Sequence, residues 1–215
     1  MQDTYKQQQE EQRQRPYKLS SVILFTAVPW IADFLYGYDC GAVSYAILQL
    51  PDEKMSGVTW GDNLSGSLIG GIVSAAALGA FLASSWIIQE RQRPQMGYMH
   101  ELQLGAVLYL VGAALQASCR WMLHFELAMT TLITGRLIYG LGIGVSMHAA
   151  PAYLGEMSPT SIRGFCLSMK EAANVVGVLA GYQAGHYFSA YPGGWAFSFM
   201  ISCAFALMSL TISLW

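Results

Sequence analysis

Charged residues are scarce in this chain of 215 residues. Only 11% of the residues are Asp, Glu, Lys or Arg, whereas 54% are hydrophobic. A soluble domain usually carries about 25% charged residues. The composition therefore indicates that much of the molecular surface does not face water.

An excess of positive charge is also missing, since the net charge is −2. Without a basic field the chain has nothing to attract a nucleic acid, and we expect no such partner. No nucleophile–base set or phosphate-binding loop stands outside the apolar runs, so we expect no enzyme and no cofactor. The four cysteines are too widely spaced for a disulfide framework or a metal site, and we expect buried thiols.

The first twenty residues lack the apolar stretch of a secretory signal. They are polar and rich in Gln, and acids such as Asp3 and Glu10 argue against an organelle transit peptide. We expect residues 1–20 to form a disordered cytosolic tail.

Long apolar runs dominate the rest of the chain, over residues 21–215. A helix needs about 20 apolar residues to cross a bilayer, and unbroken runs exclude the alternation of a membrane β-barrel. The sequence therefore predicts an all-α membrane protein in which six transmembrane helices form one bundle. The runs are Ser21–Leu48, Leu64–Ile88, Tyr98–Cys119, Leu127–Gly155, Arg163–Phe188 and Trp195–Trp215.

Lys and Arg in the loops predict the orientation, because cytoplasmic loops carry an excess of them. With a cytosolic N-terminus, the outside carries only Lys54 and Arg120. We therefore expect both termini in the cytosol. The inside then carries Lys6, Arg13, Arg15, Lys18, Arg91, Arg93 and Arg163.

Small residues recur at intervals of four along several runs, which lets helix backbones approach closely. We expect these positions to pack the bundle. They are Gly66/Gly70, Ala75/Gly79/Ala83, Gly140/Gly144 and Gly177/Gly181/Gly185.

Several ionisable residues stand inside the predicted spans, where each costs roughly 2.5–3.5 kcal/mol and suggests a function. Asp33 and Asp39 are about 120° apart around one helix, so they cannot both face one partner directly. Asp39 and Arg136 are the natural pair, because each alone would be uncompensated. The pair is either a fixed tie between the first and fourth spans or a proton switch. Other ionisable residues in the spans are Lys170, Glu171, His148 and His186.

Three ordered stretches resemble the sugar porter branch of the major facilitator superfamily. Two further segments, Met147–Pro151 and Leu167–Glu171, are most similar to its plant and algal vacuolar or plastidic glucose transporter-like group, also called xylose–proton symporter-like. The three stretches are Gly37-Tyr38-Asp39-Cys40-Gly41-Ala42-Val43-Ser44; Gly135-Arg136 with Gly140, Gly142 and Gly144; and Pro151-x-Tyr153-x-x-Glu156-x-x-Pro159-x-x-x-Arg163-Gly164.

The resemblance implies a role for several residues. The carboxylate of proton-coupled members and its arginine partner fall on Asp39 and Arg136. A sugar-contacting glutamine of the fifth span falls on Glu171. Beside these, Phe34 and Tyr38 are candidates for stacking on a sugar ring, although core packing is the more common role of such aromatics.

His148 could face the cavity or be a structural histidine. The cytosolic loop that latches the two halves of family members is altered here. It reads Gln89-Glu90-Arg91-Gln92-Arg93-Pro94. We expect Glu90, Arg91 and Arg93 to join Glu156 and Arg163 in a gating network.

The resemblance implies proton-linked transport of a hexose or pentose by alternating access, with the sugar held between two six-helix halves. This chain holds only the N-terminal half, so we expect a fragment or a truncated product that needs a C-terminal half or a partner chain. A non-transporting sensor or assembly subunit and a passive sugar or polyol facilitator are the alternatives. The expected partners are a sugar, protons and the bilayer of a vacuolar, plastid or plasma membrane.

Overall fold

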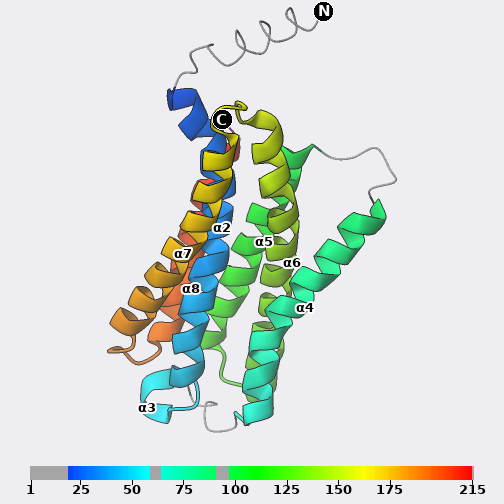
Figure 1. The fold of residues 1–215 in the computed structure, drawn as a ribbon. Coiled ribbons are helices and arrows are strands. Elements are labelled where there is room, and N and C mark those ends of the chain that lie inside the picture. The colour runs from blue at the N-terminus through cyan, green and yellow to red at the C-terminus, as the bar shows by residue number, and fades with distance from the viewer. Residues whose placement is uncertain (1–18, 59–63, 91–96, 215) are drawn as a thin grey trace, which may run out of the picture.

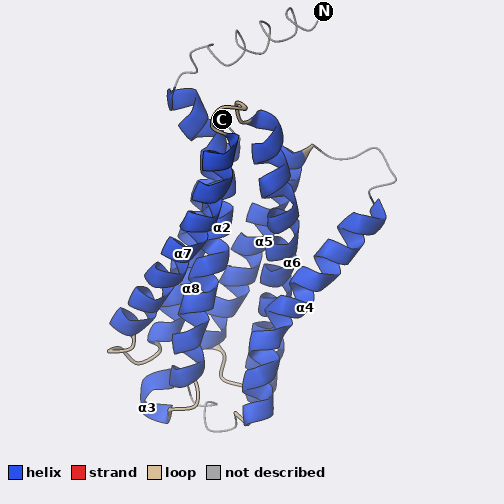
Figure 2. Cartoon of the chain, in the orientation of Figure 1, coloured by secondary structure: helices blue, strands red, loops and turns tan. Residues whose placement is uncertain are grey.

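The computed structural model describes residues 19–58, 64–90 and 97–214. Within these ranges the regular elements are all helical (Figure 2). The tail expected over residues 1–20 lies outside them, except for Leu19 and Ser20, which begin the first helix instead. The elements are α2 (Leu19–Gln49), α3 (Glu53–Ser56), α4 (Gly66–Glu90), α5 (Tyr98–Ser118), the 3-10 helix η2 (Cys119–Trp121), α6 (Phe125–Met157), α7 (Arg163–Phe188) and α8 (Gly194–Ser213).

Each predicted apolar run corresponds to one long helix, and α7 has the predicted bounds. By length and apolarity, four of the described helices can cross a membrane: α4, α5 extended by η2, α6 and α8. α2 and α7, with 31 and 26 residues, are also long enough, but they carry the charged residues Asp33, Asp39, Lys170 and Glu171. The fold is therefore that of a helical membrane protein, and buried charged residues lie on α2, α6 and α7.

The long helices lie side by side, and the first and last described residues lie at the same end of the bundle (Figure 1). α2 packs against α7 and α8, and α6 packs against α4 and α5. Contacts between α5 and α8 join these two groups. Near the end that carries the termini, α4 leans away from the other helices.

Glycines let the helices approach at two of these contacts. A Cβ atom on Gly140 of α6 would collide with the backbone of Ala76 on α4, and one on Gly181 of α7 would collide with the backbone of Tyr38 on α2. The packing role predicted for these repeats is therefore confirmed. For Gly66/Gly70 it is wrong, since nothing lies within 4 Å of a Cβ built on either residue.

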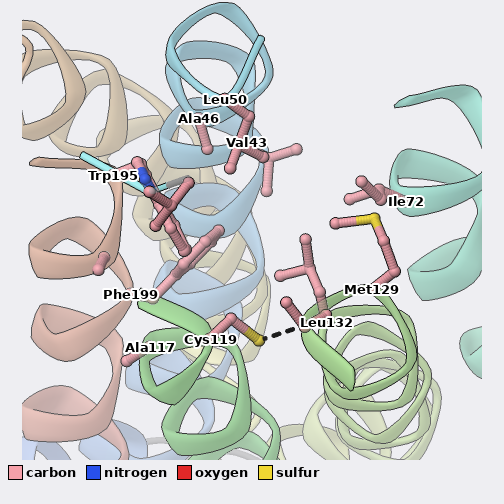
Figure 3. Packing of buried hydrophobic residues seen from close by; sticks show 13 residues of the cluster. Val43, Ala46, Leu50, Ile72, Ala117, Cys119, Met129, Leu132, Trp195 and Phe199 are labelled. Carbon is pink, nitrogen blue, oxygen red and sulfur yellow. Dashed lines mark hydrogen bonds between the residues drawn. The ribbon is translucent and has the colours of Figure 1, made fainter. Parts of the chain in front are cut away.

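A cluster of buried apolar side chains joins α2, α4, α5, α6 and α8 near the α3 end of the bundle (Figure 3). Trp195 is 1% exposed, and its indole N–H donates to the backbone oxygen of Ser56 at 2.9 Å. Because lipid tails are as apolar as these side chains, close packing stabilises such a cluster. Its residues include Val43, Ala46, Leu50, Ile72, Ala117, Cys119, Met129, Leu132, Trp195 and Phe199.

Candidate functional site

A buried ion pair links α2 to α6. Nη1 of Arg136 donates to Oδ1 of Asp39 at 2.5 Å, and the two side chains are 3% and 4% exposed. Arg136 also donates from Nε to the backbone oxygen of Ile72 at 3.3 Å, and from Nη1 to Oε1 of Gln116 at 3.4 Å. The arginine therefore ties α2, α4 and α5 to its own helix, and the pairing inferred from the sequence is present.

The pair lies at a cavity of about 460 Å³ between α2, α4 and α6. A cavity of this size is within the range that small ligands occupy, and such sites are mostly apolar with a few polar groups. The lining residues are Tyr36, Asp39, Cys40, Val43, Ser44 and Ile47 of α2, Val73, Ala76, Ala77 and Ala80 of α4, and Arg136, Ile143 and Met147 of α6.

A second charge cluster joins α2 to α7. Nζ of Lys170 donates to Oδ2 of Asp33 at 2.7 Å and to Oε1 of Glu171 at 2.8 Å. Lys170 and Asp33 are 6% and 3% exposed, whereas the side chain of Glu171 is 73% exposed. Nδ2 of Asn174 donates to the backbone oxygen of Asp33 at 3.3 Å, which adds a second polar tie.

The contact between Asp33 and Lys170 was not predicted. In the sequence, each of the two residues is a charge inside a predicted span. Their opposite charges on two different helices are the signal from which the contact could have been predicted. The sequence does show that Lys170 and Glu171 are neighbours, and the structure brings their charged groups together.

Two of the proposed sugar-contacting aromatics lie inside the bundle. Tyr38 is 1% exposed, and its hydroxyl donates to the backbone oxygen of Ser198 on α8 at 3.1 Å. Phe34 is half-buried, with its ring centroid 4.8 Å from that of Phe205. The ring centroid of Tyr38 lies 6.4 Å from that of Phe205, so Tyr38 has the core packing that is the more common role of such aromatics, and a contact with sugar stays a prediction.

His148 does not line the cavity beside Arg136. Its Nδ1 lies 3.1 Å from Oε2 of Glu101 on α5, and its ring centroid lies 6.3 Å from that of Tyr98. These contacts with Glu101 and Tyr98 are those of a histidine with a structural role, and 38% of the His148 side chain is exposed.

The expected gating residues lie near the ends of α4, α6 and α7. Arg91 and Arg93 lie outside the described residues, as does the side chain of Glu90. Glu156 is exposed, and Nη2 of Arg163 donates to the backbone oxygen of Ser158 at 3.4 Å. Within the described part of the chain, no ion pair joins Glu156 to Arg163.

The cysteines are free, as expected, but they are not all buried. Cys119 and Cys166 are buried, and Cys203 is half-buried. Cys40 is exposed and lines the cavity next to Asp39. The expectation of buried thiols is therefore wrong for Cys40.

Comparison with known proteins gives consistent matches. Residues 25–215 match the family model described as "Sugar (and other) transporter". The chain is 37% identical over 199 residues to the chloroplastic D-xylose-proton symporter-like 3 of Arabidopsis thaliana, covering 93% of this chain and 34% of the relative. It is 29% identical over 165 residues to the galactose-proton symporter of Escherichia coli, covering 77% of this chain and 32% of the relative. The chain thus spans about a third of the length of these curated relatives.

Solved structures share the fold. A partially occluded, inward-open structure of the xylose transporter XylE from E. coli matches with a TM-score of 0.77 and 22% identity, covering 91% of this chain and 48% of that chain. A crystal structure of a D-xylose-proton symporter matches with a TM-score of 0.76 and 23% identity, covering 90% and 48%. The matched region is about half of each transporter.

Proposed function

The chain belongs to the sugar transporter family, and from this premise we propose that it forms the N-terminal six-helix half of a proton-coupled monosaccharide carrier. The relatives named as symporters of xylose or galactose support this substrate class. The chain covers only about a third of their length, so the proposal includes a second six-helix half that closes over the sugar. α2 and α7 complete the six proposed spans, because Asp33, Asp39 and Lys170 are buried inside the bundle and do not face lipid.

The observation that carries the proposal is the buried pair of Asp39 and Arg136 beside the cavity. While the two side chains touch, the arginine keeps the carboxylate ionised. When the halves move and separate the pair, a dry, unpaired carboxylate becomes unfavourable and takes up a proton. Proton binding is then linked to the change of conformation that carries the sugar across.

Uptake into vesicles tests this coupling in a carrier that contains this half. With an imposed pH difference, the wild-type protein should accumulate labelled xylose or glucose against a gradient. Asp39→Asn mimics the protonated acid, so it should abolish accumulation while sparing exchange of sugar down its gradient. Asp52→Asn is the matched control, because this carboxylate is exposed before α3 and should leave accumulation unchanged.

Each outcome separates the proposal from its alternatives. Undiminished accumulation by Asp39→Asn would exclude Asp39 as the coupling site. Uptake that never exceeds equilibrium in the wild-type protein would indicate a passive facilitator. Absence of any saturable sugar uptake would favour a sensor or assembly subunit.

We also propose that Glu171 faces the sugar. An exposed carboxylate within a membrane-spanning helix needs water or a polar ligand, and Glu171 is 73% exposed. Its oxygens can accept hydrogen bonds from sugar hydroxyls. Phe34 and His148 remain weaker candidates, because each already packs against other side chains.

The orientation and the gating network complete the proposal. The loop charges support a cytosolic N-terminus, so reporters fused after Gly57 and after Trp215 should lie on opposite sides. If both reporters lie on the same side of the membrane, this topology is excluded. Glu156, Arg163, Glu90, Arg91 and Arg93 form the proposed cytosolic network. Nε of Arg163 has no hydrogen-bond partner among the described residues, which leaves it available for such a network.

Gating and sugar binding can be separated by charge reversal at Glu156. Glu156→Arg should trap one conformation while sugar affinity in detergent stays close to that of the wild-type protein. A large loss of affinity with normal exchange between conformations would contradict the gating role.

A further inference from the structure

The cluster of Asp33, Lys170 and Glu171 contains two carboxyl groups and one ammonium group. When all three are ionised, the cluster carries one surplus negative charge. The pair of Asp39 and Arg136 is balanced, with one charge of each sign. Of these two clusters, the one at the contact between α2 and α7 therefore carries the surplus charge.

The cluster is separate from the Asp39 site. Six residues of helix place Asp33 about 9 Å along the axis and about 120° around it from Asp39. Lys170 reaches Asp33 from α7, whereas Arg136 reaches Asp39 from α6. The two sites therefore have different partners on different helices.

Few other titratable groups face Asp33. On α5, Tyr109 donates to the backbone oxygen of Ala32 at 3.5 Å, and on α6, Tyr139 donates to that of Leu35 at 3.0 Å. α8 contains no Asp, Glu, Lys, Arg or His, and its Cys203 contacts α5. On α2 itself the neighbours are Tyr36 and Asp39. Lys170 is therefore the cation that balances Asp33, and it must also serve Glu171.

Exposure explains how the surplus charge is tolerated. Glu171 can be hydrated at 73% exposure, while Asp33 and Lys170 are withdrawn from water. If Glu171 loses its water, two carboxylates share one ammonium in a medium of low polarity. Two carboxyl groups in that situation retain a proton between them, because they cannot both stay ionised.

We propose that Asp33, Lys170 and Glu171 form a second proton-binding site, which holds one exchangeable proton on its carboxyl groups and lies apart from the Asp39–Arg136 pair. A hydronium ion transfers its proton to a carboxylate oxygen, so that one O–H bond forms, one O–H bond of the hydronium ion breaks and a water molecule is left. Lys170 stays protonated and donates to whichever carboxylate remains ionised. This inference concerns proton binding by the chain itself and does not rest on sugar transport.

Infrared spectroscopy of the 215-residue chain in lipid vesicles tests it. The carbonyl stretch of a protonated carboxylic acid should appear as pH falls, at a higher pH than for carboxylates in water. Glu171→Gln leaves Asp33 with Lys170, and Asp33→Asn leaves Glu171 with Lys170. Each remaining pair is neutral, so each variant should lose the band, whereas Asp39→Asn should keep it.

Lys170→Gln gives the opposite expectation. It removes the ammonium and leaves two carboxyl groups, so the band should persist to higher pH than in the wild-type protein. Circular dichroism confirms that each variant is folded, and Glu171→Gln, at an exposed position, is the variant least able to disturb the fold.

Two results would overturn the proposal. A wild-type chain with no band above the pH at which exposed carboxylates titrate has no such site. A band that survives Asp33→Asn but not Glu171→Gln belongs to a single lipid-exposed carboxyl group and not to the cluster. Either result leaves the proposed transport function untouched, because that function is tested by uptake.

Discussion

The two charge clusters on α2 differ in how a cation compensates the buried carboxylate. Asp39 has one arginine partner from α6, and both side chains are almost fully buried. Asp33 has a lysine partner from α7, which it shares with the exposed Glu171. One cluster is balanced and enclosed, and the other is unbalanced and open on one side.

This difference indicates how each cluster can respond. Arg136 compensates a single carboxylate, whereas Lys170 is shared by two carboxyl groups. In the proposed mechanism, the Asp39 pair changes its charge when the helices move and separate it. The Asp33 cluster can change without movement, by binding a proton or losing water at Glu171.

The largest expected effect follows loss of the enclosed cation. Arg136→Met leaves Asp39 buried without compensation, and we expect the free energy of unfolding in mixed micelles to fall by about 3–5 kcal/mol. The double variant Asp39→Asn/Arg136→Met removes both charges and should recover most of that loss. A double variant as unstable as Arg136→Met would show that packing of the arginine, and not its charge, stabilises the bundle.

A smaller loss is expected in the open cluster. Lys170→Met should cost about 1–3 kcal/mol, because Glu171 can still be hydrated and Asp33 can take up a proton. Lower pH should reduce this loss, since a neutral Asp33 no longer needs a cation. The free energy of unfolding, measured at neutral and at acidic pH, gives this loss. The double variant Asp33→Asn/Lys170→Met is the control, because its stability should not depend on the charge of Asp33. If Lys170→Met lost the same free energy of unfolding at neutral and at acidic pH, the loss would not be due to charge.

The polar support of the enclosed pair should matter less than the pair itself. Gln116 is fully buried, but its bonds to Arg136 and to the backbone oxygen of Gly135 are both 3.4 Å long. Bonds of that length are weak, so Gln116→Leu should lower the free energy of unfolding by about 0.5–1.5 kcal/mol. If Gln116→Leu lost as much free energy of unfolding as Arg136→Met, Gln116 would be essential for the stability of the ion pair.

The smallest effect on stability is expected at the exposed end of the open cluster. Glu171→Gln should change the free energy of unfolding by no more than about 0.5 kcal/mol. In the complete carrier it should also retain sugar binding, because an amide can bond to hydroxyls. Glu171→Leu should abolish binding, and a ligand titration that finds normal affinity in this variant would exclude Glu171 from the sugar site.

The apolar runs were sufficient to predict the long helices. A run long enough to cross a bilayer must form a helix, because its backbone groups find no other partners in lipid. The short α3 was missed because a local cap defines it. Asp52 accepts from the backbone N–H of Lys54, and Gly57 ends the helix with a φ of 63°. Four residues carry no periodic signal that could predict such an element.

The sequence by itself determined the helices, the charges within them and the pairing of Asp39 with Arg136, because a lone buried charge requires a counter-charge. Only the tertiary structure decided which side of α2 each residue faces. That rotation turns Tyr38 toward α8 and Asp33 toward Lys170 of α7. Its physical reason is close glycine packing, since Gly37 and Gly41 of α2 lie against the backbone of α7 and allow a single orientation of the two helices.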